Sequence, residues 1–318
     1  MSSLAASAAT SAPGFSHLVT VEDSLKGTQA IPPDRARHFC AELEAGHIVF
    51  LPVSPIAISQ EDRELLLGRK QTSSAYHKNI AYRPAEDRIT GLDASEQAEA
   101  DSLRRILQEF SKRSVEFLAG FLSPYAGKWK LDYASYRPLE EEGRPARLHA
   151  RNDLLHFDSF PTRPTNGARI LRFFVNLNPM KSRVWLTSET FESFGPRFAR
   201  AGSMLASAAG NPVTRGMRSF ARTLRLPFGS RPPYDEFMHR CHNAMKEDAS
   251  FQEHTPKQRW EFPPDSAWMV FTDCVSHAVL SGQYALEQTF QIPQSALVES
   301  QISPLAILEK IAGQPLTL

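Results

Sequence analysis

The sequence predicts an α+β protein with a mainly β core of jelly-roll or barrel type and helices packed around it. After residue 128 the chain breaks into six or more short strand-like runs separated by prolines and glycine turns, a pattern typical of such β folds. Residues 17–127 carry mostly helical patterns, and the strand pattern is interrupted again at about 190–257. We therefore expect a mostly helical N-terminal support, a core over 128–293 and a helical, basic insertion within that core.

The composition is typical of a soluble globular protein and gives no reason to expect nucleic-acid binding. Of 318 residues, 42% are hydrophobic and 22% are charged, and the net charge is +1, so there is no general attraction to polyanions. The three cysteines are few and odd in number, which favours a reducing, cytoplasmic compartment over a disulfide framework. No run of about 18 apolar residues predicts a transmembrane helix.

The chain length is compatible with one domain that has extensions at both ends. Residues 1–16 are small and polar and lack the basic and apolar regions of a secretion signal, so we expect a disordered tail. Residues 17–318 are expected to form a single domain, in which 294–318 is a C-terminal extension. The sequence does not indicate an oligomeric state.

Helices and a strand are predicted in order along the N-terminal part. Residues 33–45 follow a double proline, have spaced apolar positions and stop at a glycine, as a helix does. The run HIVFLPV (47–53) is rich in β-branched residues and predicts a strand. A second helix is expected at 59–69, loop and short strand at 73–84, and the longest helix, with an apolar stripe, at 94–124.

The β core is predicted from runs rich in strand-forming residues. Asn-Gly and Ser-Gly pairs mark turns between some of them. The runs are KLDYASYRP (130–138), RLHARNDLLHFD (147–158), ARILRFFVNLN (168–178), SRVWLTSE (182–189), AWMVFTD (267–273) and ALEQTFQIP (285–293).

The insertion concentrates positive charge in a chain that is otherwise neutral. Between residues 181 and 231, nine lysines and arginines stand against two glutamates. On a helix, four of these arginines form one basic face, which is compatible with peripheral contact to an anionic membrane and equally with an ordinary solvated surface. These four are Arg215, Arg218, Arg222 and Arg225.

One His-x-Asp phrase, His156-Phe157-Asp158, occurs in the chain. Residues two apart on a strand point the same way, so both side chains are expected to face the interior. Two histidines and one carboxylate on one side of a ferrous ion leave other positions open for reactants. The alternative is that two polar residues alternate there by chance.

His277 is the expected third ligand. It lies between two strand-like runs, among small and apolar neighbours, and distant strands converge in a jelly roll. The alternative is a buried histidine that is hydrogen-bonded to backbone. A zinc site at His239, Cys241 and His242 is less favoured, because the sequence offers no second ligand cluster for it.

A 2-oxoglutarate cosubstrate would need a buried cation for its distal carboxylate, preferably an arginine. The strand after the last histidine, ALEQTF, has no Arg or Lys, so the strand after the His-x-Asp is the other source. Alternation there puts Arg172 and Asn176 on one face and Arg169 on the other. Arg172 is therefore the preferred clamp and Arg169 a structural arginine, unless a bulge exchanges them. Asn176 and Gln288 are further cofactor candidates.

Long segments around these residues resemble the Kdo 3-hydroxylases, a family of Fe(II)- and 2-oxoglutarate-dependent dioxygenases that act on 3-deoxy-D-manno-oct-2-ulosonic acid (Kdo) of the lipopolysaccharide inner core. The resemblance covers most of residues 47–293. The segments that carry it are HFDSFPTRPTNGARILRFFVNLNP, WMVFTDCVSHAVLSGQYALEQTF, YHKNIAYRP (76–84) and DYASYRPLEEEGRP (132–145).

The resemblance implies a double-stranded β-helix, the cupin-like form of the jelly roll. It implies that His156, Asp158 and His277 bind iron. It also implies hydroxylation of Kdo at C3 to give Ko, with succinate and CO2 as coproducts.

The implied substrate, Kdo-containing lipid A or a related glycolipid, carries a carboxylate and phosphates. Cationic and polar side chains are therefore expected around the entrance to the site, and the protein is expected in the cytoplasm, with peripheral contact at the inner face of the inner membrane. The candidates for substrate binding are Lys78, Asn79, Tyr82, Arg83, Arg137, Arg151 and Arg163.

Other functions remain compatible with the sequence. One is a 2-oxoglutarate-dependent hydroxylase of another sugar or of a protein side chain. Another is a jelly roll that binds anionic glycans without catalysis, for which the metal triad would have no use. A non-oxidative cupin would have no obvious use for an inward arginine.

Overall fold

A computed structural model describes most of the chain. The described residues are 14–21, 30–68, 79–92, 99–200, 205 and 231–318. Most of the expected N-terminal tail lies outside them, as do Lys78 and the four arginines of the expected basic face, Arg215, Arg218, Arg222 and Arg225.

The described strands form two sheets. They are β1 (Leu18–Thr20), β2 (Ile48–Leu51), β3 (Ile80–Arg83), β4 (Arg88–Thr90), β5 (Lys130–Arg137), β6 (Arg169–Asn176), β7 (Arg183–Thr190), β8 (Gln258–Phe262), β9 (Ala267–Phe271), β10 (Val275–Ser281) and β11 (Ala285–Ile292). The larger sheet has the order β1-β2-β9-β6-β11-β5-β3-β4, and the smaller has the order β10-β7-β8. Among these pairings β1–β2 is parallel, and the others are antiparallel.

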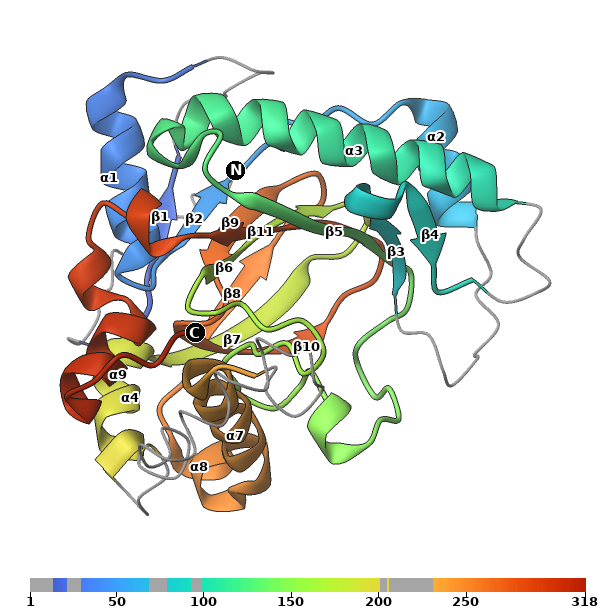
Figure 1. The fold of residues 1–318 in the computed structure, drawn as a ribbon. Helices are drawn as coiled ribbons and strands as arrows, with labels where there is room; N and C mark the ends of the chain where they lie inside the picture. The colour runs from blue at the N-terminus through green and yellow to red at the C-terminus, as the bar shows by residue number, and fades with distance from the viewer. Residues whose placement is uncertain (1–13, 22–29, 69–78, 93–98, 201–204, 206–230) are drawn as a thin grey trace, which may run out of the picture.

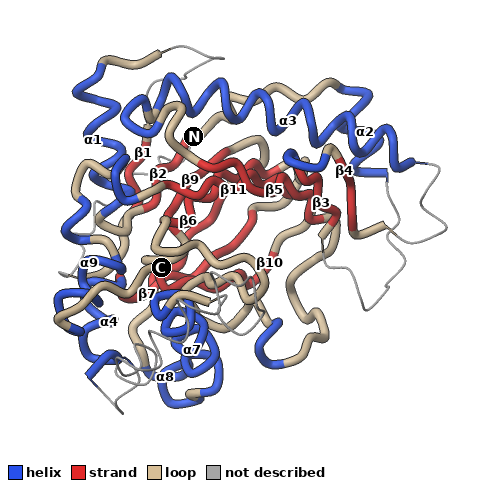
Figure 2. Tube along the Cα trace, viewed as in Figure 1, coloured by secondary structure: helices blue, strands red, loops and turns tan. Residues whose placement is uncertain are grey.

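Helices lie on both sides of the molecule, with the two sheets between them (Figures 1 and 2). The described α-helices are α1 (Pro33–Glu44), α2 (Gln60–Gly68), α3 (Ala100–Phe121), α4 (Phe191–Arg200), α7 (Pro233–Glu247), α8 (Ala249–His254) and α9 (Pro304–Ala312). In Figure 1, α3 runs along one side of the larger sheet, whereas α7 and α8 lie on the other side of the molecule. None of the described helices is long and apolar enough to span a bilayer.

The apolar stripe of α3 forms the core with the larger sheet. Phe110 and Phe117 of α3 contact Phe173 of β6, with ring centroids 6.4 and 5.8 Å apart. Since side chains alternate along a strand, the face of β6 that carries Phe173 is directed toward α3. The neighbouring residues Arg172 and Phe174 are left to face the space between the sheets.

The predicted helices and most predicted strands are confirmed, but the N-terminal part is less helical than expected. It contributes β1 to β4, which extend the larger sheet at both ends. The prediction of a strand over residues 147–158 is wrong. That segment has a short 3-10 turn at Leu148–Ala150 and otherwise irregular backbone. It pairs with β10 through one isolated bridge, at His156, and the N–H of Leu155, which points away from β10, donates to the side chain of Gln252 at 2.8 Å.

Candidate functional site

The three expected metal ligands come together between the two sheets. His156 lies in irregular backbone that forms an isolated bridge to His277 of β10. The two residues exchange backbone hydrogen bonds of 3.1 and 3.0 Å, and the N–H of Asp158 donates to the carbonyl of Thr272 at 2.8 Å. One possible ligand atom from each of His156, Asp158 and His277 lies within 4.8 Å of the others. The three side chains therefore converge as expected, although His156 and Asp158 lie in a loop held by backbone hydrogen bonds and not in the predicted strand.

Backbone carbonyls fix the orientation of both imidazoles. Nδ1 of His156 lies 2.8 Å from the carbonyl oxygen of Leu154, and Nδ1 of His277 lies 2.9 Å from that of Val275. A carbonyl oxygen only accepts hydrogen bonds, so each Nδ1 carries the proton and each Nε2 keeps its lone pair. This is the tautomer that a ligating histidine with a second partner adopts.

Two further rings hold the imidazoles in place. Trp185 of β7 stacks on His277, with ring centroids 5.2 Å apart and planes 20° apart. His242 of α7 meets His156 edge-on at 4.8 Å, and its Nδ1 lies 2.8 Å from the carbonyl oxygen of Phe157. His242, weighed above as part of a zinc site, therefore supports the loop that carries the His-x-Asp.

The electrostatics of the site favour neutral imidazoles and an ionised carboxylate. Burial lowers the pKa of His156 well below its usual value, and it also lowers the pKa of His277. Burial by itself would raise the pKa of Asp158, but Arg172 and the adjacent His156 hold it well below the usual range. These are the protonation states that metal binding requires.

A cavity of about 180 Å³ opens beside the three residues. Its walls combine cationic, amide and aromatic side chains from both sheets. The lining residues are Asn79, Arg137, Asn152, His156, Asp158, Arg172, Phe174, Arg183, Trp185, His277 and Val279.

Arg172 and Arg137 of the cavity wall share buried Glu287 of β11. Arg172 lies 3.0 Å from Asp158 and 3.1 Å from Glu287, and so meets two carboxylates. Arg137 donates to Glu287 through Nε at 3.1 Å and also through a terminal nitrogen. Although burial opposes ionisation, Arg172 and Arg137 lower the pKa of Glu287 to about 2. The charges of these two arginines are thus largely balanced within the protein.

Arg183 of β7 is the least balanced cation of the cavity. Its side chain is buried, donates to the carbonyl of Gly282 at 2.9 Å and lies 3.5 Å from Glu141, which Arg144 approaches at 3.4 Å. Its Nε is buried without a hydrogen-bond partner. Burial, with repulsion from Arg137, lowers the pKa of Arg183 to about 10.

Three of the expected cofactor residues lie away from the cavity. Arg169 is fully buried on the opposite face of β6, where Nε donates to Asp273 at 2.8 Å. The amide of Asn176 donates to the carbonyls of Lys181 and Phe262. Asn176 and Gln288 are not among the residues that line the cavity, and their amides hold backbone.

Gln288 follows Glu287 in β11, so its side chain points to the opposite face of the strand. Its amide donates to the carbonyl of Asp132 at 3.0 Å and to that of Thr289 at 2.9 Å.

Of the described substrate candidates, Asn79 and Arg137 line the cavity. The others lie outside it, each bound to a nearby acidic side chain: Tyr82 to Asp87, Arg83 to Glu86, Arg151 to Asp153 and Arg163 to Asp132. Each of these four side chains is directed toward its own carboxylate partner and not toward the cavity.

The sequence interpretation missed Arg183, Trp185 and Asn152, all of which line the cavity. Arg183 and Trp185 are two residues apart on a strand that was predicted, so the alternation used for Arg172 could have identified them. Asn152 had no such signal, because it lies in the irregular loop before the His-x-Asp.

Comparisons with known proteins agree on one family. The family model described as 3-deoxy-D-manno-oct-2-ulosonic acid (Kdo) hydroxylase matches residues 26–315. No curated protein sequence matches the chain.

Crystal structures of the Kdo hydroxylase KdoO, described as a non-heme Fe(II) α-ketoglutarate-dependent dioxygenase, have a similar fold. The complex with α-ketoglutarate and Fe(III) is 29% identical, covers 94% of this chain and 97% of that chain, and has a TM-score of 0.79. The complex with cobalt(II) is 30% identical, with the same coverage and a TM-score of 0.80. The complex with succinate and Fe(III) is 29% identical, again with this coverage, and has a TM-score of 0.79.

The buried acid of the cavity generates a pH prediction. Glu287→Gln leaves Arg172 and Arg137 without their shared charge, so we expect the free energy of unfolding at pH 7 to fall by about 3–5 kcal/mol. Since the folded-state pKa of Glu287 is lowered to about 2 from an ordinary 4.5, its stabilisation is fully present above pH 4.5 and is lost as the pH falls toward 2. Urea unfolding at several pH values should show the difference from wild type shrinking across that window.

Glu261→Gln is the control for this measurement. Glu261 pairs with Arg259 on the surface at 3.1 Å, so its loss should change stability little at any pH. A Glu287→Gln difference that stays constant from pH 7 to pH 3 would contradict the assigned ionisation of Glu287.

Proposed function

Because the chain belongs to the Kdo hydroxylase family, we propose that it is an Fe(II)- and 2-oxoglutarate-dependent dioxygenase that hydroxylates C3 of Kdo in a lipopolysaccharide precursor to give Ko. The observation that carries this proposal is the group of buried His156 and His277 with partly buried Asp158, whose possible ligand atoms lie within 4.8 Å of one another. Two imidazoles and one carboxylate beside an open cavity form the ligand set of non-heme ferrous oxygenases.

We also propose that the fold is a double-stranded β-helix. Two layers would face each other across the site. One is β5-β11-β6-β9 within the larger sheet, and the other consists of the His156 segment followed by β10-β7-β8. The segment between β7 and β8, which includes α4, α7 and α8, would then be the insertion expected from the sequence.

When bound, iron, 2-oxoglutarate and oxygen supply the oxidising power that replaces a C–H bond by C–OH, with succinate and CO2 as coproducts. His156, Asp158 and His277 would hold the metal, with Nε2 as the ligating atom of each ring. Arg172, through its 3.0 Å contact with Asp158, would orient that carboxylate. Trp185 and Phe174 would keep bulk water away from the cavity wall. The cavity as a whole would hold substrate C3 against the reacting group.

Of the three arginines that line the cavity, Arg172 and Arg183 are the candidates for the distal carboxylate of 2-oxoglutarate. Arg172 is the one favoured by strand alternation, and it faces the cavity. It already meets Asp158 and Glu287, whereas buried Arg183 has only a 3.5 Å contact with a carboxylate. A buried cation without a matched anion favours binding of one. We therefore propose Arg183 as the principal clamp, with Arg172 as its neighbour.

Arg137 and Asn79 are the proposed contacts for the substrate. Both line the cavity, and Kdo has a carboxylate and several hydroxyl groups that an arginine and an amide can bind. The buried Oδ1 of Asn79 has no hydrogen-bond partner, so it is available as an acceptor for a sugar hydroxyl.

Residues 206–230 lie outside the described part of the chain, and a role for them is proposed from sequence alone. Arg215, Arg218, Arg222 and Arg225 would contact anionic lipid at the inner face of the inner membrane, where a Kdo-containing lipid A precursor is presented. The protein would then be cytoplasmic and peripheral.

Loss of a proposed metal ligand should abolish turnover. His156→Ala and Asp158→Ala should each lower the rate of succinate and hydroxylated-Kdo formation by more than about 100-fold, since weakening even an outer partner of a metal ligand costs 10–100-fold. Mass spectrometry of the product should show a gain of one oxygen atom in wild type. His254→Ala, an exposed histidine on α8, should retain activity; turnover by the two ligand variants would refute the proposed site.

The two arginines make separable predictions for 2-oxoglutarate. Arg183→Ala should raise the KM for 2-oxoglutarate by at least about 30-fold, because truncating one partner of a buried charged pair costs about 2 kcal/mol or more. Arg183→Lys should recover part of this loss, and Arg151→Ala, whose arginine pairs with Asp153 at the surface, should leave the KM unchanged. A large KM effect in Arg172→Ala with none in Arg183→Ala would assign the clamp to Arg172.

The basic face makes a prediction about membranes. Replacing Arg215, Arg218 and Arg222 by Ser should weaken flotation with anionic liposomes by roughly 100-fold in partition, at about 1 kcal/mol for each charge near the surface. Flotation with neutral liposomes should be weak for both proteins. Unchanged flotation with anionic liposomes would indicate an ordinary solvated surface.

A further inference from the structure

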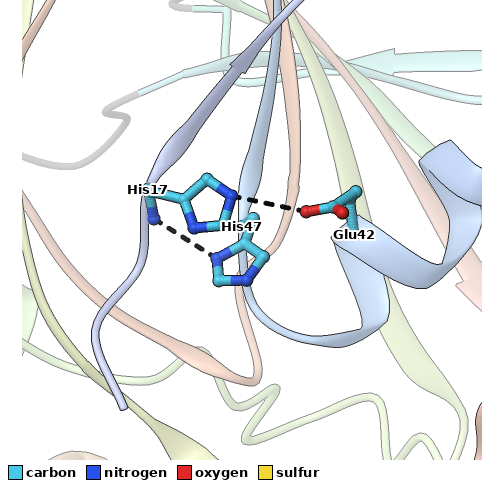
Figure 3. A group of neighbouring side chains, drawn as sticks. All are labelled: His17, Glu42 and His47. Atoms are coloured by element: carbon cyan, nitrogen blue, oxygen red, sulfur yellow. Dashed lines mark hydrogen bonds and ion pairs between the residues drawn. The ribbon is translucent and has the colours of Figure 1, made fainter. Parts of the chain in front are cut away.

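A second group of imidazole and carboxylate side chains lies apart from the cavity (Figure 3). His17 immediately precedes β1, Glu42 lies in the last turn of α1, and His47 immediately precedes β2. One possible ligand atom from each lies within 4.8 Å of the others. Within the described residues, this group and the cavity triad are the two that meet this condition.

The contacts among these side chains are close but incomplete. Nε2 of His17 lies 3.4 Å from a carboxylate oxygen of Glu42. The backbone N–H of His17 donates to Nδ1 of His47 at 3.3 Å, and the two ring centroids are 3.5 Å apart. Nδ1 of His17 is buried and has no hydrogen-bond partner. A buried nitrogen left without a partner is costly unless something binds it.

His47 presents one lone pair within the group. Because the backbone N–H of His17 donates to Nδ1 of His47, that nitrogen carries a lone pair and no proton. A metal ion bound to this nitrogen would take the place of the 3.3 Å hydrogen bond. Imidazole nitrogens and carboxylate oxygens are ligands that zinc accepts, and a structural zinc site has a fourth ligand besides these three.

A fourth side chain lies at the edge of the group. Nδ1 of His38 is 3.7 Å from the other carboxylate oxygen of Glu42, one helical turn away on α1. The two oxygens of Glu42 thus face two different histidines. His38 is mostly exposed, so it is free to turn toward a bound ion or to leave that position to water.

We propose that His17, Glu42 and His47 bind a divalent transition metal, zinc by the chemistry of the ligands, as a structural site separate from the catalytic cavity. The ion fastens the N-terminal strand to the connection between α1 and β2. The ion would add to the existing backbone contacts of this segment: β1 has three residues and, among the described strands, pairs with β2 at the edge of the larger sheet, while Phe15 forms an isolated bridge to Glu189. Cross-linking His17 to His47 also closes a long loop, which restricts the unfolded chain.

The test uses the full-length, metal-free protein and Zn²⁺ alone as the probe. His156→Ala/His277→Ala removes the imidazoles of the cavity, so that remaining binding reports the second group. Calorimetric titration should give one equivalent of Zn²⁺ for this double variant and two for wild type. Zn²⁺ should also raise the thermal midpoint of the double variant by several degrees, since a ligand that binds only the folded state stabilises it.

Variants of the second group are introduced into this double-variant background. His17→Ala and His47→Gln should each weaken Zn²⁺ binding by at least 100-fold and remove the thermal shift. Glu42→Gln keeps the shape of the side chain and should weaken binding less than the histidine variants do. His254→Ala, on exposed α8, is the matched control and should leave both readouts unchanged.

Two results would overturn the proposal: no Zn²⁺ binding by the His156→Ala/His277→Ala protein, or binding that persists in His17→Ala and His47→Gln. Cobalt(II) absorption gives a check that does not depend on stability, because a site with imidazole ligands should give a visible spectrum that His47→Gln abolishes. Succinate formation by otherwise wild-type His47→Gln, loaded with iron, should be retained. Failure of the second site is therefore distinguishable from failure of the proposed dioxygenase activity.

Discussion

The two-way backbone pairing between His156 and His277 is the contact on which the site depends. With hydrogen bonds of 3.1 and 3.0 Å, it joins an irregular loop to β10 at a single bridge. Because both residues also bond Nδ1 to nearby carbonyls, backbone geometry fixes the position and the tautomer of each ring. The ligating face is thus set before any metal arrives, which lowers the free energy required to organise the site.

Charge balance is the second constraint, and it follows from placing several arginines between two sheets. Glu287 holds Arg172 and Arg137 together, and Arg172 in turn holds Asp158. A buried cation is tolerated when its charge is met by a carboxylate. Arg183, with its weaker contact to Glu141, is the cation of the cavity wall whose charge is least matched. The same principle that stabilises the wall is the basis for proposing Arg183 as the contact for an anionic ligand.

Membership of the Kdo hydroxylase family explains why histidines and arginines line a cavity between the two sheets. The second histidine group has a different character: it lies beside β1 and β2, at one end of the larger sheet, and joins segments that are distant in sequence. A catalytic metal keeps an open position beside a cavity, whereas a structural metal is closed in by its ligands. The cavity triad has the first arrangement, and the second group is proposed to have the other.

The sequence by itself determined the helices, most strands, the grouping of His156, Asp158 and His277, and the separation of Arg172 from Arg169 on β6. Each follows from local periodicity or from residue types that a chemistry requires. Only the tertiary structure decided that the His-x-Asp lies in a loop and not in a strand, since the loop meets distant β10 at one isolated bridge. It also decided that Asn176 and Gln288 hold backbone, and that Arg183 faces the cavity with its charge poorly matched. Which side chains pair and which charges balance depend on which distant segments meet, and the local sequence pattern does not contain that information.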